Sequence, residues 1–440
     1  MFSRKIIPYL KKWKNKTNRK PLILEGARQV GKTSAVLMFG EKHFKNVINI
    51  NLEKLEYKTL FQNEMSLNDV IKTIEIKFNQ EIIPGETLIF FDEIQNSPTL
   101  IKQIRFFKEE KPKIHVIATG SLLGPMLKKY GFSFPVGRVE YAYMYPLDFF
   151  EFLKANNNKE ILKYLKEISF NETIPDGIHK QAMDLFYKYT MIGGMPEIVQ
   201  LFIEGKNKEL KNTYSSLFTG YSEDAHKYSS LEKSIYINHV INKAPFSVGN
   251  TITYNRFGDS NFGSKNMKYA FSALEKAMLL HQIPTTQSKA LPLKPKTRSR
   301  FKLFFLDVGL VNYQRGIQEN NLEIKDLNHF HRGKIAEQVV AQNIISQFIN
   351  QPYKIMYWRK PPQKGEAEID FCLNKNGKIL GIEVKSGKTG HLKSLYQFSN
   401  AVKNNQIIRI YSGELKKETK TKQNKSLLSI PFYLTPRILD

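Results

Sequence analysis

The eight residues GARQVGKT, Gly26–Thr33, constrain this chain more than any other part of its sequence. They match the pattern G-x-x-x-x-G-K-[ST], and they lie between an apolar run, PLILE, and a helical pattern, SAVLMF. Glycines in such a turn allow backbone N–H groups to surround a phosphate at the positive end of a helix dipole. We expect Lys32 to contact the β and γ phosphates of ATP and Thr33 to contact Mg²⁺. The whole predicted phosphate loop comprises Gly26, Ala27, Arg28, Gln29, Val30, Gly31, Lys32, Thr33 and Ser34.

Two carboxylates close a second apolar run, LIFFDE, which predicts a buried strand ending at Asp92 and Glu93. In P-loop ATPases the first carboxylate helps hold Mg²⁺, and the second is placed to polarise the attacking water. We therefore expect Asp92 to serve as a metal ligand and Glu93 as the general base. A further strand, HVIATGS, would bring Ser121 to the γ-phosphate. Arg138 follows a glycine-bearing loop and is either a transition-state cation, in its own or a neighbouring subunit, or a surface arginine.

Apolar periodicity divides the chain into three expected domains. Short apolar strands alternate with helical stretches in residues 1–155, which predicts a parallel sheet covered on both faces. Residues 156–325 show helical patterns followed by a hairpin with a basic tip, typical either of a winged helix or of a helical bracing domain. Residues 326–440 predict a helix, an alternating strand, a hairpin at Asn376-Gly377, a helix and the last strand NQIIRIYS. The following KKETKTKQNK predicts a solvated loop.

A second group of acidic residues lies in the C-terminal segment. Glu383 and Lys385 are two positions apart on one strand and face the same side, and Asp370 lies within cross-strand reach. With Glu337 on the preceding helix, they resemble the core of the PD-(D/E)xK nuclease superfamily, although Ile369 replaces the usual proline. The resemblance implies that Glu337, Asp370 and Glu383 bind Mg²⁺ or Mn²⁺, and that Lys385 helps activate water at a phosphodiester. The alternative is an ordinary strand with alternating charges.

Charge restricts the partners. The chain has 67 Lys and Arg against 41 Asp and Glu, a net charge of +26, which favours a polyanion, with DNA as the expected partner. The alternative is a solubilising lysine-rich surface. No run of about 18 apolar residues predicts a transmembrane segment, and the single cysteine fits a reducing cytoplasm. The basic N-terminal segment carries an apolar stripe, Ile6, Ile7, Leu10 and Trp13, which we expect to pack on its own domain rather than on a membrane surface.

The motifs GARQVGKTS, LIFFDEIQ, VIATGS and GRVEYAYMYPLDFFEFL together resemble a family of prokaryotic AAA-class P-loop ATPases over nearly the whole chain. In that family the last motif closes the ATPase domain. The middle segment resembles the family through Gly193-Gly194-Met195-Pro196 and Phe305–Leu310, for which we expect packing roles. The resemblance implies an α/β fold: a parallel-sheet P-loop NTPase domain, a helical or winged-helix-like middle domain and a C-terminal α/β restriction-endonuclease-like domain. AAA-class relatives often form rings, so a homo-oligomer is an option.

Two hypotheses about function follow. The first is a Mg²⁺-dependent ATPase that acts on DNA, with a nuclease-like domain that cleaves phosphodiester bonds. The second is a nucleotide-controlled switch that binds DNA or a protein through a catalytically inactive nuclease-like domain. They differ at Asp370 and Lys385, because replacing these residues abolishes cutting only under the first hypothesis.

Overall fold

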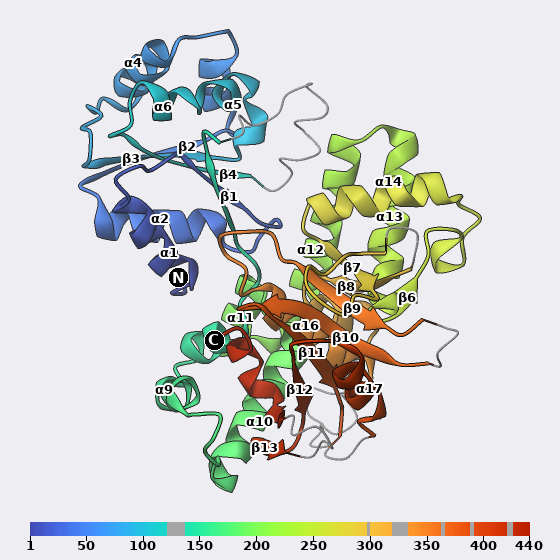
Figure 1. Cartoon of the computed structure of the whole chain (residues 1–440). Coiled ribbons are helices and arrows are strands. Elements are labelled where there is room, and N and C mark those ends of the chain that lie inside the picture. The colour runs from blue at the N-terminus through green and yellow to red at the C-terminus, as the bar shows by residue number, and fades with distance from the viewer. Residues whose placement is uncertain (121–136, 297–299, 319–332, 362–365, 388–390, 420–425) are drawn as a thin grey trace. The chain divides into compact units, whose positions relative to one another are not determined.

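The chain forms two compact units in the computed structural model (Figure 1). Unit 1 consists of Met1–Tyr145 with the short segments Lys276–Leu279 and Phe348–Pro352, and unit 2 contains the rest. The residues that the structure describes are 1–120, 137–296, 300–318, 333–361, 366–387, 391–419 and 426–440.

Unit 1 is a five-stranded parallel sheet of order β2-β3-β4-β1-β5, with helices on both faces (Figure 1). Its strands are β1 Leu22–Glu25, β2 Asn46–Asn51, β3 Thr87–Asp92, β4 His115–Gly120 and β5 Glu140–Tyr143. Its helices are α1 Ile6–Lys14, α2 Lys32–His43, α3 Leu55–Lys58, α4 Leu67–Phe78, α5 Pro98–Gln103 and α6 Phe106–Glu109. This arrangement confirms the predicted parallel sheet. Because β4 lies between β1 and β3, the carboxyl ends of all three strands meet at one edge.

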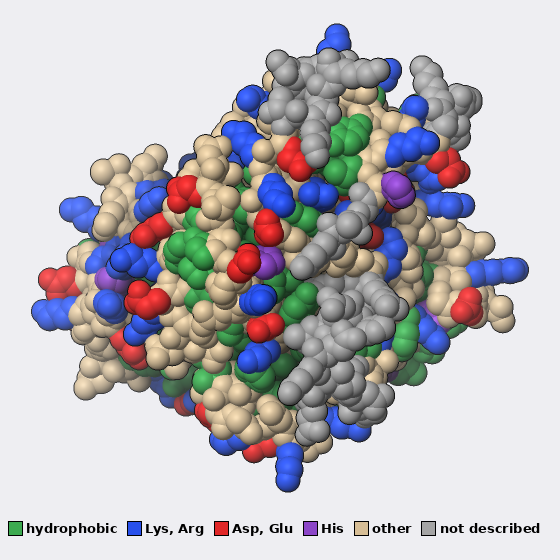
Figure 2. All heavy atoms as spheres, turned by 90° about the horizontal axis from the view of Figure 1, so that it is seen from below, with side chains coloured by type: hydrophobic (Ala, Val, Ile, Leu, Met, Phe, Trp, Pro, Cys, Tyr) green, Lys and Arg blue, Asp and Glu red, His purple; other side chains and the backbone are tan. Residues whose placement is uncertain are grey.

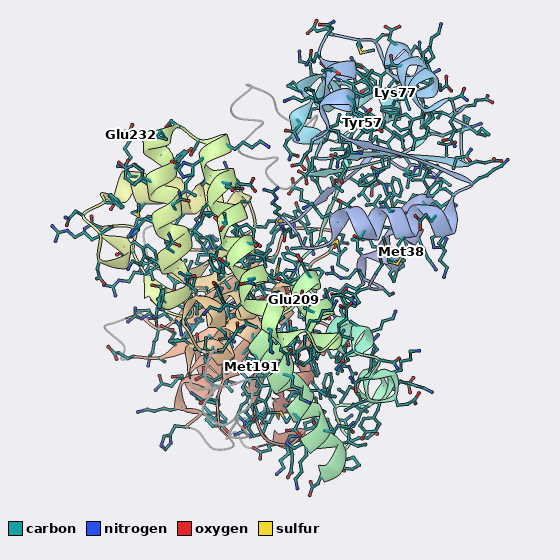
Figure 3. The ribbon with its side chains drawn as sticks, turned by 180° about the vertical axis from the view of Figure 1, so that it is seen from behind. Met38, Tyr57, Lys77, Met191, Glu209 and Glu232 are labelled. Atoms are coloured by element: carbon teal, nitrogen blue, oxygen red, sulfur yellow. The ribbon has the colours of Figure 1, made fainter. Side chains whose placement is uncertain are left out.

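Apolar side chains fill both faces of this sheet. On one face, residues of α4, α5 and α6 join Ile23 and Phe91 in a core cluster. At its outer margin Tyr57 and Lys77 lie close together (Figure 3), with the Lys77 ammonium 5.8 Å from the ring centroid. On the other face α1 lies beside α2, with Ile6, Leu10 and Trp13 of the predicted stripe buried and Ile7 only partly buried. The N-terminal stripe is therefore part of the unit's own core, as the sequence predicted.

Unit 2 combines a helical part with a large mixed sheet. Its helices are α8 Phe149–Ala155, α9 Lys159–Glu167, α10 Asp176–Ile192, α11 Pro196–Ile203, α12 Asn207–Tyr228, α13 Leu231–Lys243, α14 Ser264–Lys276, α15 Val308–Gln314, α16 Lys334–Ile345 and α17 Lys393–Ala401. Its strands are β6 Thr251–Ile252, β7 Leu280–Thr286, β8 Phe301–Phe305, β9 Ile355–Arg359, β10 Glu368–Lys375, β11 Lys378–Val384, β12 Asn405–Tyr411, β13 Lys416–Thr419 and β14 Ser426–Pro431. Met191 on α10 is buried, whereas Glu209 on α12 and Glu232 on α13 are exposed (Figure 3 labels all three).

The sheet of unit 2 crosses the boundary expected near residue 325. Its nine strands have the order β13-β14-β12-β11-β10-β9-β7-β8-β6, in which β7 pairs parallel with β9. The hairpin of the middle segment therefore extends the sheet of the C-terminal segment, and the two segments share one compact unit. Two local predictions were wrong. Strand β12, expected to be the last strand, is followed by β14, which pairs with it. Lys416–Thr419, expected in a loop, form β13 because they pair with the other edge of β14.

The glycine motifs of the middle segment serve packing, as expected. The wholly buried carboxylate of Asp307 accepts the backbone N–H of Gly194 at 2.7 Å and of Gly309 at 2.8 Å. The Gly194 carbonyl accepts the N–H of Leu147 at 2.7 Å. A Cβ on Gly193, whose φ is 73°, would lie 1.9 Å from Asp307 Oδ1, so no side chain fits there.

The stretch that follows β5, expected to close the first domain, contacts the Gly193-Gly194 motif and α10. Unit 2 begins at Pro146, whereas the first domain was expected to extend to residue 155. Phe149 packs edge-on against Phe186 at 5.0 Å, and Glu151 forms a reciprocal cap with Asp148 at the start of α8, where Phe152 is also buried. The stretch therefore packs against α10, a contact that its own sequence pattern did not reveal.

Candidate nucleotide site and carboxylate cluster

The predicted phosphate loop connects β1 to α2 at the shared strand edge. Gly31 and Gln29 adopt left-handed backbone conformations, with φ of 91° and 64°. Such angles turn consecutive N–H groups toward the inside of a loop, which forms a concavity suited to an anion. A Cβ on Gly26 would lie 2.5 Å from the Met144 carbonyl oxygen, so only glycine fits at that position. Ala27, Arg28, Val30 and Ser34 complete the loop and the first turn of α2.

The polar side chains of this loop converge with the ends of β3 and β4. The buried Lys32 ammonium donates to the carbonyls of Gly26 at 2.9 Å and Ala27 at 2.8 Å. The Thr33 hydroxyl donates to Asp92 Oδ2 at 2.8 Å, and the Thr119 hydroxyl donates to Asp92 Oδ1. The structure thus brings Asp92 next to Lys32 and Thr33, although Asp92 lies 59 positions beyond Thr33 in the sequence.

Burial and hydrogen bonding act on Asp92 in opposite directions. Desolvation raises the pKa of its carboxyl group, while the hydrogen bonds from Thr119 and Thr33 lower it, and the net shift is upward. The neighbouring Glu93 has a left-handed backbone, with φ of 54°, and its carboxylate accepts the Gln95 amide. This carboxylate directly follows Asp92, and its role as a general base stays a prediction.

The two remaining nucleotide-site predictions fare differently. Arg138 forms an ion pair with Glu109, at 2.9 Å between Nε and Oε1, and its side chain is 55% exposed. Within unit 1 it is therefore a surface arginine. Ser121 lies outside the described residues, and Thr119 is the hydroxyl of that strand that reaches Asp92.

Arg4 contacts the loop from outside the motif and was missed by sequence reasoning. Its buried guanidinium donates to the Val30 carbonyl at 2.7 Å and to the Tyr145 carbonyl at 2.6 Å. It therefore ties the phosphate loop to the chain that follows β5. Its place before α1, among seven other basic residues, gave no signal that distinguished it.

The acidic residues of unit 2 surround a lysine that the sequence did not single out. Lys302, on β8, is 1% exposed, and its ammonium lies 2.8 Å from Asp370 Oδ1, 3.1 Å from Glu337 Oε2 and 2.9 Å from Glu368 Oε1. Burial lowers the pKa of this lysine, but the charges of the three carboxylates raise it by more. The pKa of Lys302 therefore lies well above its ordinary value. Lys302 therefore stays protonated. A lone lysine inside the apolar run FKLFF was the available signal.

The predicted hairpin geometry of the cluster is confirmed. Strands β10 and β11 pair through Phe371 and Ile382, and Asp370 Oδ2 accepts the Val384 N–H at 2.9 Å. The Lys385 ammonium lies 2.6 Å from Glu383 Oε1. Burial, and secondarily the charge of Asp370, raises the pKa of Glu383 to about 7. The other buried oxygen of Glu383 has no hydrogen-bond partner in the described part of the chain.

The expected metal site is not formed by these carboxylates. Within the described residues, no group of three or more His, Cys, Asp or Glu side chains is arranged to hold a metal ion. The physical reason is that the Lys302 ammonium already bonds to Asp370, Glu337 and Glu368. The donor set of Glu337, Asp370 and Glu383 therefore does not fit a divalent cation as it stands.

Fold and loop geometry define unit 1 as a P-loop nucleotide-binding domain, and comparison with known proteins gives its class. Residues 18–153 match the family model of an AAA domain. Residues 183–321 match a domain of unknown function (DUF8612), and residues 332–433 match another (DUF4143). The N-terminal part of the chain is thus similar to AAA-type ATPase domains, and the other two models lie within the middle and C-terminal segments.

No curated protein matches the chain. Among solved structures, the Aeropyrum pernix Orc1 protein in complex with DNA matches at 10% identity over 71% of this chain and 91% of that chain. Its TM-score is 0.29, which does not establish a common fold. No helix in the described ranges is both long and apolar enough to span a membrane.

Proposed function

We propose that this chain is a Mg²⁺-dependent ATPase that binds DNA, with hydrolysis in unit 1 controlling the binding by unit 2. The observation that carries the ATPase proposal is the hydrogen bond from Thr33 to Asp92 at 2.8 Å, beside the buried ammonium of Lys32. A hydroxyl and a carboxylate are oxygen ligands of the kind that Mg²⁺ prefers, so these two residues fit that ion. Bound Mg²⁺ would neutralise phosphate charge.

The protein's own groups have distinct roles in this proposal. The N–H groups of the loop and Lys32 bind the phosphates, and Glu93 polarises the attacking water. The AAA domain match over residues 18–153 supports the same activity. Arg138 pairs with Glu109 within its own unit. It would therefore stabilise transition-state charge only in the nucleotide site of a neighbouring copy, as an arginine finger.

The DNA-binding part of the proposal rests on the winged-helix-like region. Lys and Arg side chains are scattered among Asp and Glu over the face in Figure 2, so net charge alone does not locate a surface. Strands β7, β8 and β6 are neighbours in that order, and α14 precedes the β7–β8 hairpin as a recognition helix does. Helix α14 buries Met267 and Phe271 and exposes Lys265, Lys268 and Tyr269. Its exposed face therefore offers two cations and an aromatic ring to a phosphate backbone.

ATP hydrolysis by the full chain tests the first half of the proposal. Lys32→Ala should abolish it, and Glu93→Gln should lower kcat by about 10²–10⁴-fold while ATP binding persists, as for loss of a general base. Lys42→Ala is the matched control, because Lys42 is an exposed lysine at the far end of α2. Hydrolysis at the wild-type rate in both site variants would refute the assignment.

DNA binding, measured by fluorescence anisotropy across salt concentrations, tests the second half. The double variant Lys265→Glu/Lys268→Glu should weaken binding and reduce the slope of log K against log salt by about 2. The control Lys163→Glu/Lys166→Glu makes the same change of charge on exposed positions of α9. Equal losses in both variants would show that α14 is not the binding element.

A further inference from the structure

We propose that the Lys302 ammonium permanently takes the place of a divalent metal ion in the carboxylate cluster of unit 2, so that this nuclease-like site binds no metal and cuts no DNA by metal-dependent chemistry. The inference concerns unit 2 alone and does not depend on the ATPase proposal. It explains why residues that match a metal-dependent nuclease pattern do not form a metal site.

The Lys302 ammonium hydrogen-bonds to Glu337 and Asp370 and forms an ion pair with Glu368. An ammonium group has three N–H donors and no acceptor. Three carboxylate oxygens, from Glu337, Glu368 and Asp370, lie between 2.8 and 3.1 Å from Lys302 Nζ. Its side chain is 1% exposed, so water does not compete for these donors. Carboxylate oxygens surround the Lys302 ammonium as they would surround a metal ion, so Nζ occupies the position of that ion.

Each oxygen of the two central carboxylates already has a partner. Asp370 gives Oδ1 to Lys302 and Oδ2 to the Val384 N–H at 2.9 Å. Glu337 gives Oε2 to Lys302 and Oε1 to Lys334 at 2.8 Å. Only one buried oxygen of Glu383 has no partner in the described residues. A single oxygen cannot hold Mg²⁺ or Mn²⁺, which need several oxygen ligands, and the neighbouring ammonium repels either ion.

The cation and its ligands come from different segments. Lys302 lies on β8, within the segment matched at residues 183–321, whereas the three carboxylates lie within the segment matched at residues 332–433. The pairing of β7 with β9 brings β8 to this position. The middle segment therefore supplies the positive charge that the C-terminal segment would otherwise need from a metal ion.

Binding of Mn²⁺ alone, without nucleotide, tests the inference in the full chain carrying Asp92→Ala, which removes the metal ligand of unit 1. Electron paramagnetic resonance counts the bound Mn²⁺. The parent protein should bind no Mn²⁺ that depends on Asp370, so Asp370→Asn should leave the titration unchanged. A stoichiometric Mn²⁺ site in the parent that Asp370→Asn removes would overturn the proposal, and this comparison needs no variant of Lys302.

Removing the ammonium tests the replacement directly. Lys302→Met keeps most of the apolar stem and should create a Mn²⁺ site at least about tenfold tighter than any in the parent, with a rise in Tm on adding Mn²⁺. Lys302→Arg is the matched control, because it keeps the charge and should gain no site. Adding Asp370→Asn to Lys302→Met should remove the new site. A folded Lys302→Met protein without new Mn²⁺ binding would overturn the proposal, and if this variant does not fold, the Asp370→Asn comparison decides.

Discussion

Arg4 offers a direct test of how the phosphate loop is held. Arg4→Met would remove the hydrogen bonds to the carbonyls of Val30, at 2.7 Å, and Tyr145, at 2.6 Å, and would keep much of the buried stem. A hydrogen bond from a charged group contributes about 1.5–3 kcal/mol, and two bonds of one side chain are not fully additive. We therefore expect unit 1 to lose about 3 kcal/mol of unfolding free energy. For a unit of this size that corresponds to a fall in Tm of about 6–12 °C.

Tryptophan fluorescence during guanidinium unfolding measures this loss. The chain has two tryptophans, and Trp13 is buried in α1, so a Trp358→Phe background makes fluorescence report on unit 1. The matched control is Lys12→Met, which removes an exposed cation from α1, the helix that follows Arg4. Because Val30 belongs to the phosphate loop, Arg4→Met should also raise the KM for ATP. A change in unfolding free energy below about 0.5 kcal/mol would refute the bracing role, since surface substitutions give changes of that size.

Two further predictions concern unit 2. Burial gives Glu383 a pKa of about 7 against an ordinary 4.5, so the folded state binds the proton more tightly and the unfolding free energy should fall as pH rises across that range. Denaturant unfolding at several pH values should show this slope flattened by Glu383→Gln, and an unchanged slope would contradict the assignment. Gly193→Ala should prevent unit 2 from folding, because its Cβ would lie 1.9 Å from Asp307 Oδ1. Gly220→Ala, inside α12 with nothing within 4 Å of its Cβ, should instead be neutral or stabilising by up to about 1 kcal/mol, as solubility and circular dichroism would show.

Local sequence patterns determined the parts of this protein that contiguous residues build. The phosphate loop follows from one strand–loop–helix segment, because glycine spacing and backbone angles act over a few residues. The hairpin that brings Asp370 opposite Glu383 follows from the Asn376-Gly377 turn, whose residues both have positive φ, 50° and 77°. The apolar strands of unit 1 likewise predicted a parallel sheet, since strands without a polar face must be covered on both sides.

Only the tertiary structure decided which distant segments meet. The pairing of β7 with β9 places Lys302 among the carboxylates, where it bonds to Asp370, 68 positions along the chain. Arg4 reaches the phosphate loop in the same way, across 26 positions to Val30 and 141 to Tyr145. A periodic apolar pattern shows that a strand is buried, but not which strand lies beside it. That choice depends on the packing of the whole unit, where a charge introduced by one segment can complete a site made by another.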